Sequence, residues 1–187
     1  MVKYAVIVVD MIQDNVRHHG GVWDEAAKVI PNIKKLLTQA RSRGMPVIYA
    51  CDSFMPNDFL FRSQVKPHAI RGTEGVRVIP ELAPAPGDII LEKRRMSSFF
   101  KTDLDITLRT LGVDTVAVTG ITTNVCVLLT ALDGIAHDFS AVIIEDCSAA
   151  FRPEIHQAVL DIYRKTPLYP LLRVMTAQEF LQMAETT

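Results

Sequence analysis

The chain has 187 residues, of which 49% are hydrophobic and 22% charged, with a net charge of −1 and an isoelectric point near 6.5. The chain therefore has no excess of basic residues of the kind that binding to nucleic acid or to an anionic membrane requires. No segment is apolar for long enough to span a bilayer. The length fits one well-buried domain over residues 1–187. Its three cysteines are too few and too scattered for a disulfide framework, which predicts a cytoplasmic protein with free thiols.

Short apolar runs alternate with amphipathic segments along the whole chain. Residues 4–9 (YAVIVV) predict a strand that is apolar on both faces, as a parallel sheet covered by helices requires. Residues 24–43 have apolar residues at helical spacing, and Pro31 either interrupts this helix or marks its true first turn. Further strands are predicted at 46–51, 88–91, 116–118, 141–144 and 171–175, and further helices at 102–111, 125–136, 153–164 and 176–185. The alternation predicts a three-layer α/β/α fold with a six-stranded, mainly parallel sheet.

Two connections stand out between these elements. The loop at 13–22 carries His18 and His19 at its tip, where exposure to solvent is a better expectation than a shared metal ion. The connection at 53–87 contains five prolines, and a connection of this length in a compact domain is usually functional. We expect it to cover a pocket or to contribute to an interface.

The segment from Thr115 to Leu132 combines a short Val-rich run, a glycine and a polar cluster that precedes an apolar, helix-compatible stretch. The polar cluster, Thr122-Thr123-Asn124, is typical of a helix N-terminus. Cys126 then falls in or near the first helical turn, where the helix dipole favours a nucleophilic thiolate. The geometry resembles a nucleophile elbow with sulfur in place of oxygen. A small buried apolar cysteine explains this segment equally well.

Two charged residues also stand at the carboxyl ends of predicted strands, where ligand sites of doubly wound sheets lie. Asp10 ends the first strand, and Lys93 follows the run at 88–91. Each has an ordinary alternative: the carboxylate can merely end a strand, and the cations of the run Glu92-Lys93-Arg94-Arg95 can form a solvated face.

Four ordered pieces of the chain together resemble the isochorismatase-like cysteine hydrolases, which include nicotinamidases, N-carbamoylsarcosine amidases and ureidoacrylate amidohydrolases. The pieces are VIVVDMIQD at 6–14, LEKRRMSSFFKTDLD at 91–105, VTGITTNVCV at 118–127 and VIIEDCSAA at 142–150. The resemblance implies a catalytic triad of Asp10, Lys93 and Cys126. It also implies a non-proline cis peptide at Ile121–Thr122.

The resemblance further implies a reaction. Asp10 would accept the thiol proton, Lys93 would stabilise the thiolate, and Cys126 would form a thioester with an amide or ureide carbonyl, which water then hydrolyses. Backbone N–H groups of Thr122 and Cys126 would form the oxyanion hole. One point resists this geometry: in the strand order 3-2-1-4-5-6, Lys93 would leave its strand about 10 Å from Asp10. Either a loop folds back over the sheet edge or the order differs.

A departure from the nicotinamidases concerns metal binding. Those enzymes hold a metal on an Asp-x-His pair and a later histidine, whereas this chain has Asp52-Ser53-Phe54 and a single candidate, His68, for the later position. One carboxylate and one imidazole make a poor divalent site. We therefore expect no metal, no cofactor and no nicotinamidase activity.

The expected partners are a small-molecule amide substrate and water, and the resemblance implies a homo-oligomer, either a dimer or a tetramer. Candidate substrate-binding residues are Phe54, Arg71 and Phe99. Trp23 could also wall the pocket. Three other arginines could bind a substrate carboxylate: Arg62, Arg94 and Arg95. Two alternatives stay open, namely a vinyl ether hydrolase of the isochorismatase type and a redox or interaction protein that keeps the fold.

Overall fold

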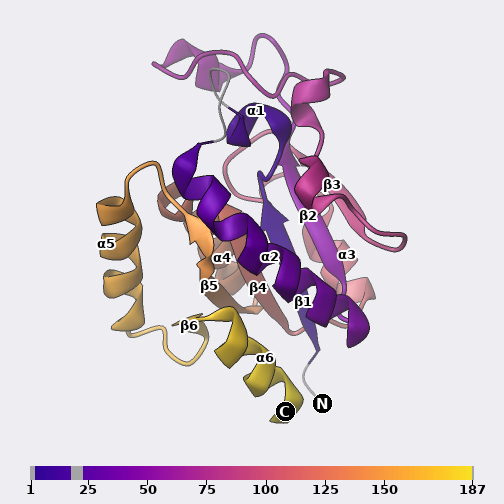
Figure 1. Ribbon diagram of the computed structural model, residues 1–187, viewed down its shortest axis with the longest axis vertical. Helices are drawn as coiled ribbons and strands as arrows, with labels where there is room; N and C mark the ends of the chain where they lie inside the picture. Colours follow the sequence, from indigo (N-terminus) through magenta and orange to yellow (C-terminus); the bar gives the residue numbers. More distant parts are fainter. Residues whose placement is uncertain (1–2, 18–22, 187) are drawn as a thin grey trace.

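The computed structural model describes residues 3–17 and 23–186, and a six-stranded parallel sheet forms its centre (Figure 1). The strands are β1 (Tyr4–Val9), β2 (Val47–Asp52), β3 (Ile89–Lys93), β4 (Thr115–Ile121), β5 (Ser140–Ala149) and β6 (Leu172–Met175). Their order is β3-β2-β1-β4-β5-β6. The predicted α/β fold is confirmed, and the order reverses between β1 and β4, where doubly wound sheets bind ligands.

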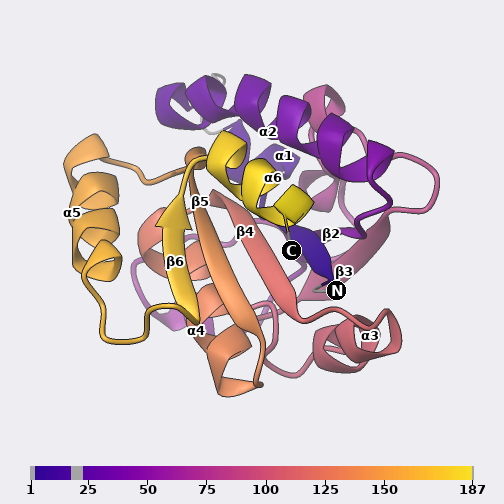
Figure 2. The same cartoon turned by 90° about the horizontal axis from the view of Figure 1, so that it is seen from below.

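Helices cover both faces of the sheet (Figure 2). The short α1 (Gln13–Val16) follows β1, and α2 (Asp24–Ser42) and α6 (Ala177–Thr186) lie on one face. The opposite face carries α3 (Leu104–Thr110), α4 (Leu128–Ala136) and α5 (Pro153–Arg164). Among the described residues, no helix has both the length and the apolar character needed to cross a membrane.

The strand β1 is buried along its whole length because both of its faces are covered. Val6 and Val8 belong to the core beneath α2 and α6, whereas Ala5, Ile7 and Val9 belong to the core beneath α3 and α4. Successive side chains of a strand point to opposite faces. This explains why the sequence reads as an unbroken apolar run rather than as an alternating one.

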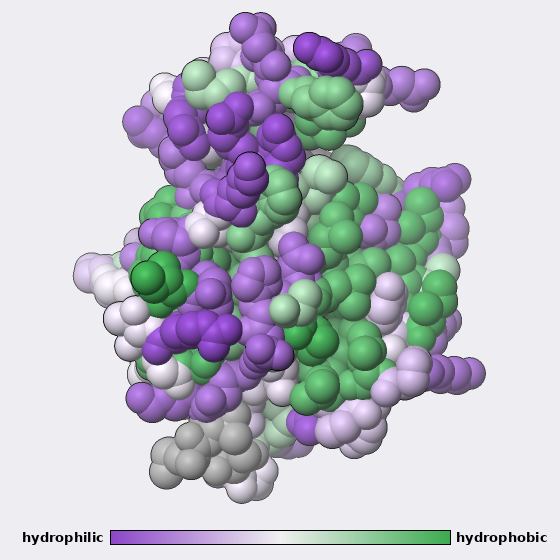
Figure 3. Space-filling model, turned by 180° about the vertical axis from the view of Figure 1, so that it is seen from behind, coloured by the Kyte–Doolittle hydropathy of each residue, from purple (hydrophilic) through white to green (hydrophobic). Residues whose placement is uncertain are grey.

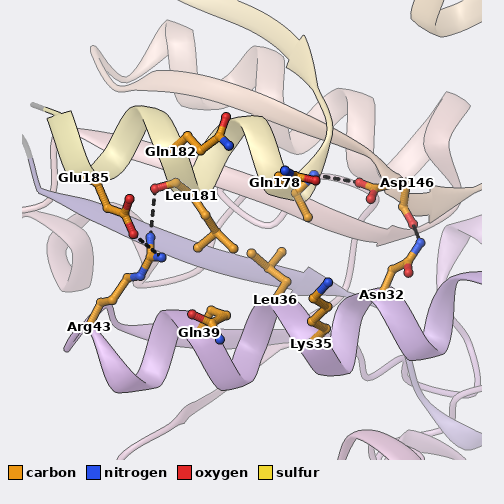
Figure 4. A pocket seen from close by; sticks show the side chains of 11 residues that line it. Asn32, Lys35, Leu36, Gln39, Arg43, Asp146, Gln178, Leu181, Gln182 and Glu185 are labelled. Atoms are coloured by element: carbon orange, nitrogen blue, oxygen red, sulfur yellow. Dashed lines mark hydrogen bonds and ion pairs between the residues drawn. The ribbon is translucent and has the colours of Figure 1, made fainter.

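The two helices on the first face are joined by polar contacts along their shared groove (Figure 4). Arg43 at the end of α2 donates to the carbonyl oxygen of Leu181 at 2.8 Å and pairs with Glu185 at 2.5 Å, both in α6. Asn32 donates to the carbonyl oxygen of Asp146 in β5 at 2.9 Å, and the Asp146 carboxylate accepts a hydrogen bond from the N–H of Ala177, the first residue of α6, at 2.8 Å. These contacts fasten the C-terminal helix to the body of the protein.

Three details differ from the sequence prediction. Pro31 lies inside α2 without breaking it, because it and the residue whose carbonyl it leaves unpaired, Ala27, are both exposed to water. The strand β4 (Thr115–Ile121) extends beyond the predicted run at 116–118 and includes Gly120. The first turn after β4, Thr123–Val127, is π-helical rather than α-helical.

The connection between β2 and β3 lies over the carboxyl edge of the sheet, at the top of Figure 1. It contains three 3₁₀ turns, Phe59–Arg62, Glu74–Val76 and Pro80–Leu82. The Asp14 carboxylate accepts a hydrogen bond from the N–H of Ala69 at 2.8 Å. A Cβ at Gly75 would lie only 2.1 Å from the same carboxylate, so any other residue there would displace the Asp14 side chain from this connection.

Candidate active site

Three neighbouring strands bring two carboxylates and one ammonium group together. The Lys93 side chain is fully buried, and its Nζ lies 2.8 Å from Asp10 Oδ2 and 2.5 Å from Asp52 Oδ1. The backbone N–H of Asp52 donates to Asp10 Oδ1 at 2.8 Å. Lys93 is the last residue of β3 and pairs in register with Asp52 on β2. Its side chain therefore crosses the end of β2 to reach Asp10, which needs neither a folded-back loop nor a different strand order.

The backbone at the end of β1 fixes the direction of the Asp10 side chain. Asp10 has a positive φ of 55°, a conformation that aspartate tolerates better than most residues. Beside it on β4, Gly120 has a φ of 102°, and a Cβ there would lie 2.1 Å from the carbonyl oxygen of Val9. A glycine is thus required for β4 to approach the end of β1 this closely.

Cys126 is positioned by the turn that follows β4. The Ile121–Thr122 peptide bond is cis, and the π-helical turn after it places Cys126 half-buried at the carboxyl edge of the sheet. The Cys126 sulfur and one carboxylate oxygen from each of Asp10 and Asp52 all lie within 4.8 Å of one another. The structure therefore brings together the three residues of the implied triad, with Asp52 as a fourth group.

The Asp10 carboxylate is suited to accept a proton near neutral pH. Its buried Oδ2 atom lies 2.8 Å from the Lys93 ammonium, and the Cys126 thiol is placed to donate to the same carboxylate. Burial raises the pKa of Asp10 to about 7, and the charge of Asp52 adds to this rise against the lowering effect of Lys93. A general base with a pKa near the working pH is the most effective one.

The pKa values of the Cys126 thiol and the Lys93 amine also differ from their ordinary values. Burial raises the pKa of the Cys126 thiol well above its usual value, although Lys93 acts to lower it. This direction runs against the thiolate that the helix dipole was expected to favour, because loss of hydration disfavours the charged sulfur. Burial acts to lower the pKa of Lys93, but Asp10 and Asp52 raise it above its usual value, so Lys93 stays charged.

A cavity of about 470 Å³ opens above these groups, a size typical of small-molecule sites. Its floor includes Asp10, Asp52 and Cys126. Its walls come from the connection between β2 and β3, the turn after β4, and the segment that precedes α5. The remaining lining residues are Asn15, Phe54, Leu60, Gln64, Val65, Lys66, Pro67, His68, Met96, Ile121, Thr122, Val125 and Phe151.

The predicted oxyanion-hole and substrate residues fall into two groups. Thr122 and Phe54 line the cavity together with Cys126. Arg71 and Phe99 do not. Arg71 lies 3.1 Å from Glu92 and donates to Ser53 Oγ at 3.0 Å.

Phe99 also lies outside the cavity. It is buried in the core beneath α3 and α4, where its ring stacks on His137 at 5.0 Å and packs against Phe139. It follows Lys93 by only six positions in the sequence, but the chain turns away from the cavity after β3. The expectation that its ring walls the substrate pocket is therefore wrong, and Phe99 has instead the core position that is usual for an aromatic residue.

Two cavity residues with specific contacts, Asn15 and Phe151, are not indicated by the sequence pattern, and Asp52 has a larger part in the site than the pattern indicates. Asn15 donates to Asp52 Oδ2 at 3.3 Å, and Phe151 lines the cavity while its ring packs on Trp23 at 4.5 Å. Asp52 was considered only as a metal ligand, although it ends a strand beside β1 and so had to lie near Asp10. His18 and His19 lie outside the described residues.

In this chain, the residues at the position where nicotinamidases hold their metal do not suit a divalent ion. Both oxygens of Asp52 already accept hydrogen bonds, from Lys93 and Asn15, so an ion there would face the Lys93 ammonium group. The Nδ1 atom of His68 bonds to the carbonyl oxygen of Lys66 at 2.8 Å, and its ring packs edge-on against Phe54. One carboxylate that is already paired and one imidazole fall short of the three or more protein ligands that a divalent site usually has.

The fold and the site define a doubly wound α/β enzyme of the hydrolase class, with a cysteine beside a buried aspartate–lysine pair. The chain belongs to the isochorismatase family, because residues 4–179 match the family model described as the isochorismatase domain.

Among its relatives, a ureidoacrylate amidohydrolase RutB from Yersinia enterocolitica is 33% identical over 192 residues, covering 88% of this chain and 80% of the relative. The RutB of Caulobacter segnis is 36% identical over 180 residues, covering 82% and 75%. The structure of N-carbamoylsarcosine amidase from Thermoplasma acidophilum superposes with a TM-score of 0.80 at 33% identity, covering 94% of this chain and 97% of that one. An isochorismatase-like hydrolase from Alkaliphilus metalliredigens gives a TM-score of 0.88 at 33% identity, covering 98% and 100%.

Proposed function

We propose that this protein hydrolyses the C–N bond of a small amide or ureide through a thioester on Cys126. The observation that carries the proposal is the grouping of a thiol, a carboxylate with a raised pKa and a buried ammonium at the floor of one cavity. The relatives named as ureidoacrylate amidohydrolases and N-carbamoylsarcosine amidase support an amidohydrolase that acts on non-peptide C–N bonds.

In the first half of the reaction, the thiol proton moves to the Asp10 carboxylate, one oxygen of which lies within 4.8 Å of the Cys126 sulfur. Because the pKa of the free thiol is raised, proton transfer accompanies the attack of sulfur on the substrate carbonyl rather than preceding it. The tetrahedral oxyanion accepts hydrogen bonds from the backbone N–H groups of Thr122 and Cys126. One such donor lowers a barrier by about 2.7–4 kcal/mol.

In the second half, Asp10 returns its proton to the leaving nitrogen, the C–N bond breaks and ammonia or an amine departs. Water then attacks the thioester while Asp10 accepts one of its protons, and that proton passes to the Cys126 sulfur as the acid is released. Lys93 stays charged throughout and balances the negative charge that Asp10 and the sulfur carry in turn. Every proton taken up in the cycle is given back.

The test compares the wild type with Cys126→Ser and with a control, Cys147→Ala, whose thiol is buried in the core away from the cavity. We expect ammonia release from a panel of amides and ureides to fall at least about a thousandfold in Cys126→Ser and to stay within threefold in the control. Intact-mass spectrometry of the wild type during turnover should show a covalent acyl adduct. Substantial activity without this thiol would indicate vinyl ether or other chemistry in which the cysteine is dispensable.

We also propose that the protein forms a homo-oligomer. Apolar side chains gather on the face covered by α4 and α5 (Figure 3), and Leu129 and Ile162 on these helices are exposed large apolar residues. Analytical ultracentrifugation across a concentration range tests this, and a monomer at all concentrations would refute it. A cytoplasmic location stays a prediction from the free thiols.

A further inference from the structure

The wall of the active-site cavity is mainly apolar, whereas the floor is polar. Above Cys126 the side chains of Phe54, Leu60, Val65 and Phe151 face the same space. Two of these are partly exposed, since the residue Phe151 is 66% exposed and Val65 is 37% exposed. A substrate that reaches the sulfur would therefore cover these groups and remove apolar surface from water.

The arginines expected to bind a substrate carboxylate are engaged elsewhere, and none of the described arginines lines the cavity. Arg94 and Arg95 both pair with the buried carboxylate of Asp58, at 2.5 and 3.3 Å. Arg62 lies over the ring of Phe59, 5.6 Å from its centre. The one lysine in the wall, Lys66, is exposed at the mouth.

The charge at the floor also opposes an anionic substrate. Asp10 and Asp52 contribute two negative charges when both are ionised, and Lys93 contributes one positive charge, which leaves one net negative charge beside the sulfur. A substrate carboxylate in this space would face that charge and would lose hydration, and the buried Lys93 is already paired with both aspartates.

We propose that the protein acts on uncharged amides or ureides whose non-reacting part is apolar. This inference rests on the proposed function and narrows it. The polar floor holds the reacting carbonyl, and the wall formed by Phe54, Leu60, Val65 and Phe151 receives the hydrocarbon part. Binding energy for the transition state thus comes from apolar surface, and a carboxylate on the same skeleton reduces kcat/KM.

The first experiment uses matched substrates and measures ammonia. Butyramide is compared with succinamate, in which a carboxylate replaces the terminal methyl, and N-ethyl-N-methylurea is compared with N-carbamoylsarcosine on the same principle. We expect kcat/KM for the neutral member to exceed that for the anion by about tenfold or more. Along acetamide, propanamide, butyramide and pentanamide, each added methylene should raise kcat/KM about fourfold until the wall is filled.

The second experiment places a cation in the wall. Phe151→Arg should lower kcat/KM for butyramide and raise it for succinamate, so that the ratio of the two changes by about tenfold or more. The control is Phe100→Arg, which makes the same chemical change at a half-exposed position outside the cavity and should leave the ratio unaltered. Circular dichroism spectra confirm that both variants are folded before the ratios are compared.

The outcomes separate this inference from the proposed function. A preference for the anionic partner in both pairs, with ammonia released and an acyl adduct on Cys126, would overturn the inference and leave the proposed function standing. A flat response to added methylenes would overturn it in the same way. No ammonia and no adduct from any of these amides or ureides would overturn both.

Discussion

Removing the amine of Lys93 tests whether the buried charge network holds the site together. The change Lys93→Met keeps an unbranched side chain of similar length but leaves Asp10 and Asp52 buried without their shared cation, which lay 2.8 and 2.5 Å from them. Removing one partner of a buried ion pair costs about 3–5 kcal/mol, because the remaining charge is uncompensated. Since whole domains are stable by about 5–15 kcal/mol, the variant should fold but be markedly weaker.

The cost should depend on pH in a definite direction. The pKa of Asp10 in the wild type is already raised to about 7, from 3.8 in the unfolded chain, and loss of the lowering effect of Lys93 raises it further. A carboxyl group with a raised pKa in the folded state destabilises that state as pH rises through the folded pKa. The variant should therefore recover at least about 1 kcal/mol of its deficit when the pH is lowered from 8 to 5.

Urea unfolding followed by circular dichroism at pH 8 and pH 5 measures both effects. With a slope near 2 kcal/mol per molar urea, the midpoint at pH 8 should fall by about 1.5–2.5 M. Adding Asp52→Asn to Lys93→Met should restore part of the loss, and the exposed-lysine control Lys66→Met should stay within about 0.5 kcal/mol of the wild type. A deficit below about 1 kcal/mol, or one equal at both pH values, would refute the account of Lys93 as the cation that balances two carboxylates.

Three further predictions concern the base, the strand contact and the covering connection. The acid limb of the pH profile of kcat/KM should have an apparent pKa near 7, because Asp10 must be ionised to accept the proton and burial raises its pKa to about 7; a limb near 4 in stopped assays of ammonia would contradict this. Gly120→Ala should destabilise the protein by about 2–6 kcal/mol in urea unfolding, since a Cβ would lie 2.1 Å from the carbonyl oxygen of Val9 at a φ of 102°; an unchanged midpoint would show that β4 can move away at no cost. Asp14→Ala should raise KM with little change in kcat and speed proteolysis within residues 53–87, since it removes the 2.8 Å bond to Ala69; equal cleavage rates would show that other contacts fix this connection.

The sequence predicted the parts of the fold that depend on local pattern. The strand β1 and the helix α5 lie where the apolar runs placed them, and a parallel sheet follows from strands that are apolar on both faces. Whether Pro31 interrupts α2 cannot be predicted from the sequence, because the answer depends on which side of the helix faces water. The same holds for β5, which continues to Ala149 beyond the predicted apolar run.

The sequence predicts those site residues that directly follow a strand. It does not predict contacts that depend on the length and direction of a side chain. Asp10, Lys93 and Cys126 meet because three strands end at one edge of the sheet. The expected gap between Lys93 and Asp10 came from strand spacing alone and ignored a lysine side chain long enough to cross one strand. Arg71 was expected in the pocket for its charge alone, and its contact with Glu92 on β3 depends on tertiary structure that no local pattern encodes.

The covering connection leaves β2 directly after Asp52 and returns into β3, which ends at Lys93. Its two ends are therefore fixed by the same hydrogen-bonded strands that hold the reacting groups, whereas its middle supplies much of the cavity wall. Exchanging residues 59–68 for a segment of equal length from another such hydrolase should alter substrate preference without changing the positions of Asp10, Lys93 and Cys126. On the proposed mechanism, substrate choice and bond cleavage would be encoded in separable stretches of one polypeptide, which would make this scaffold a practical starting point for engineering new specificities.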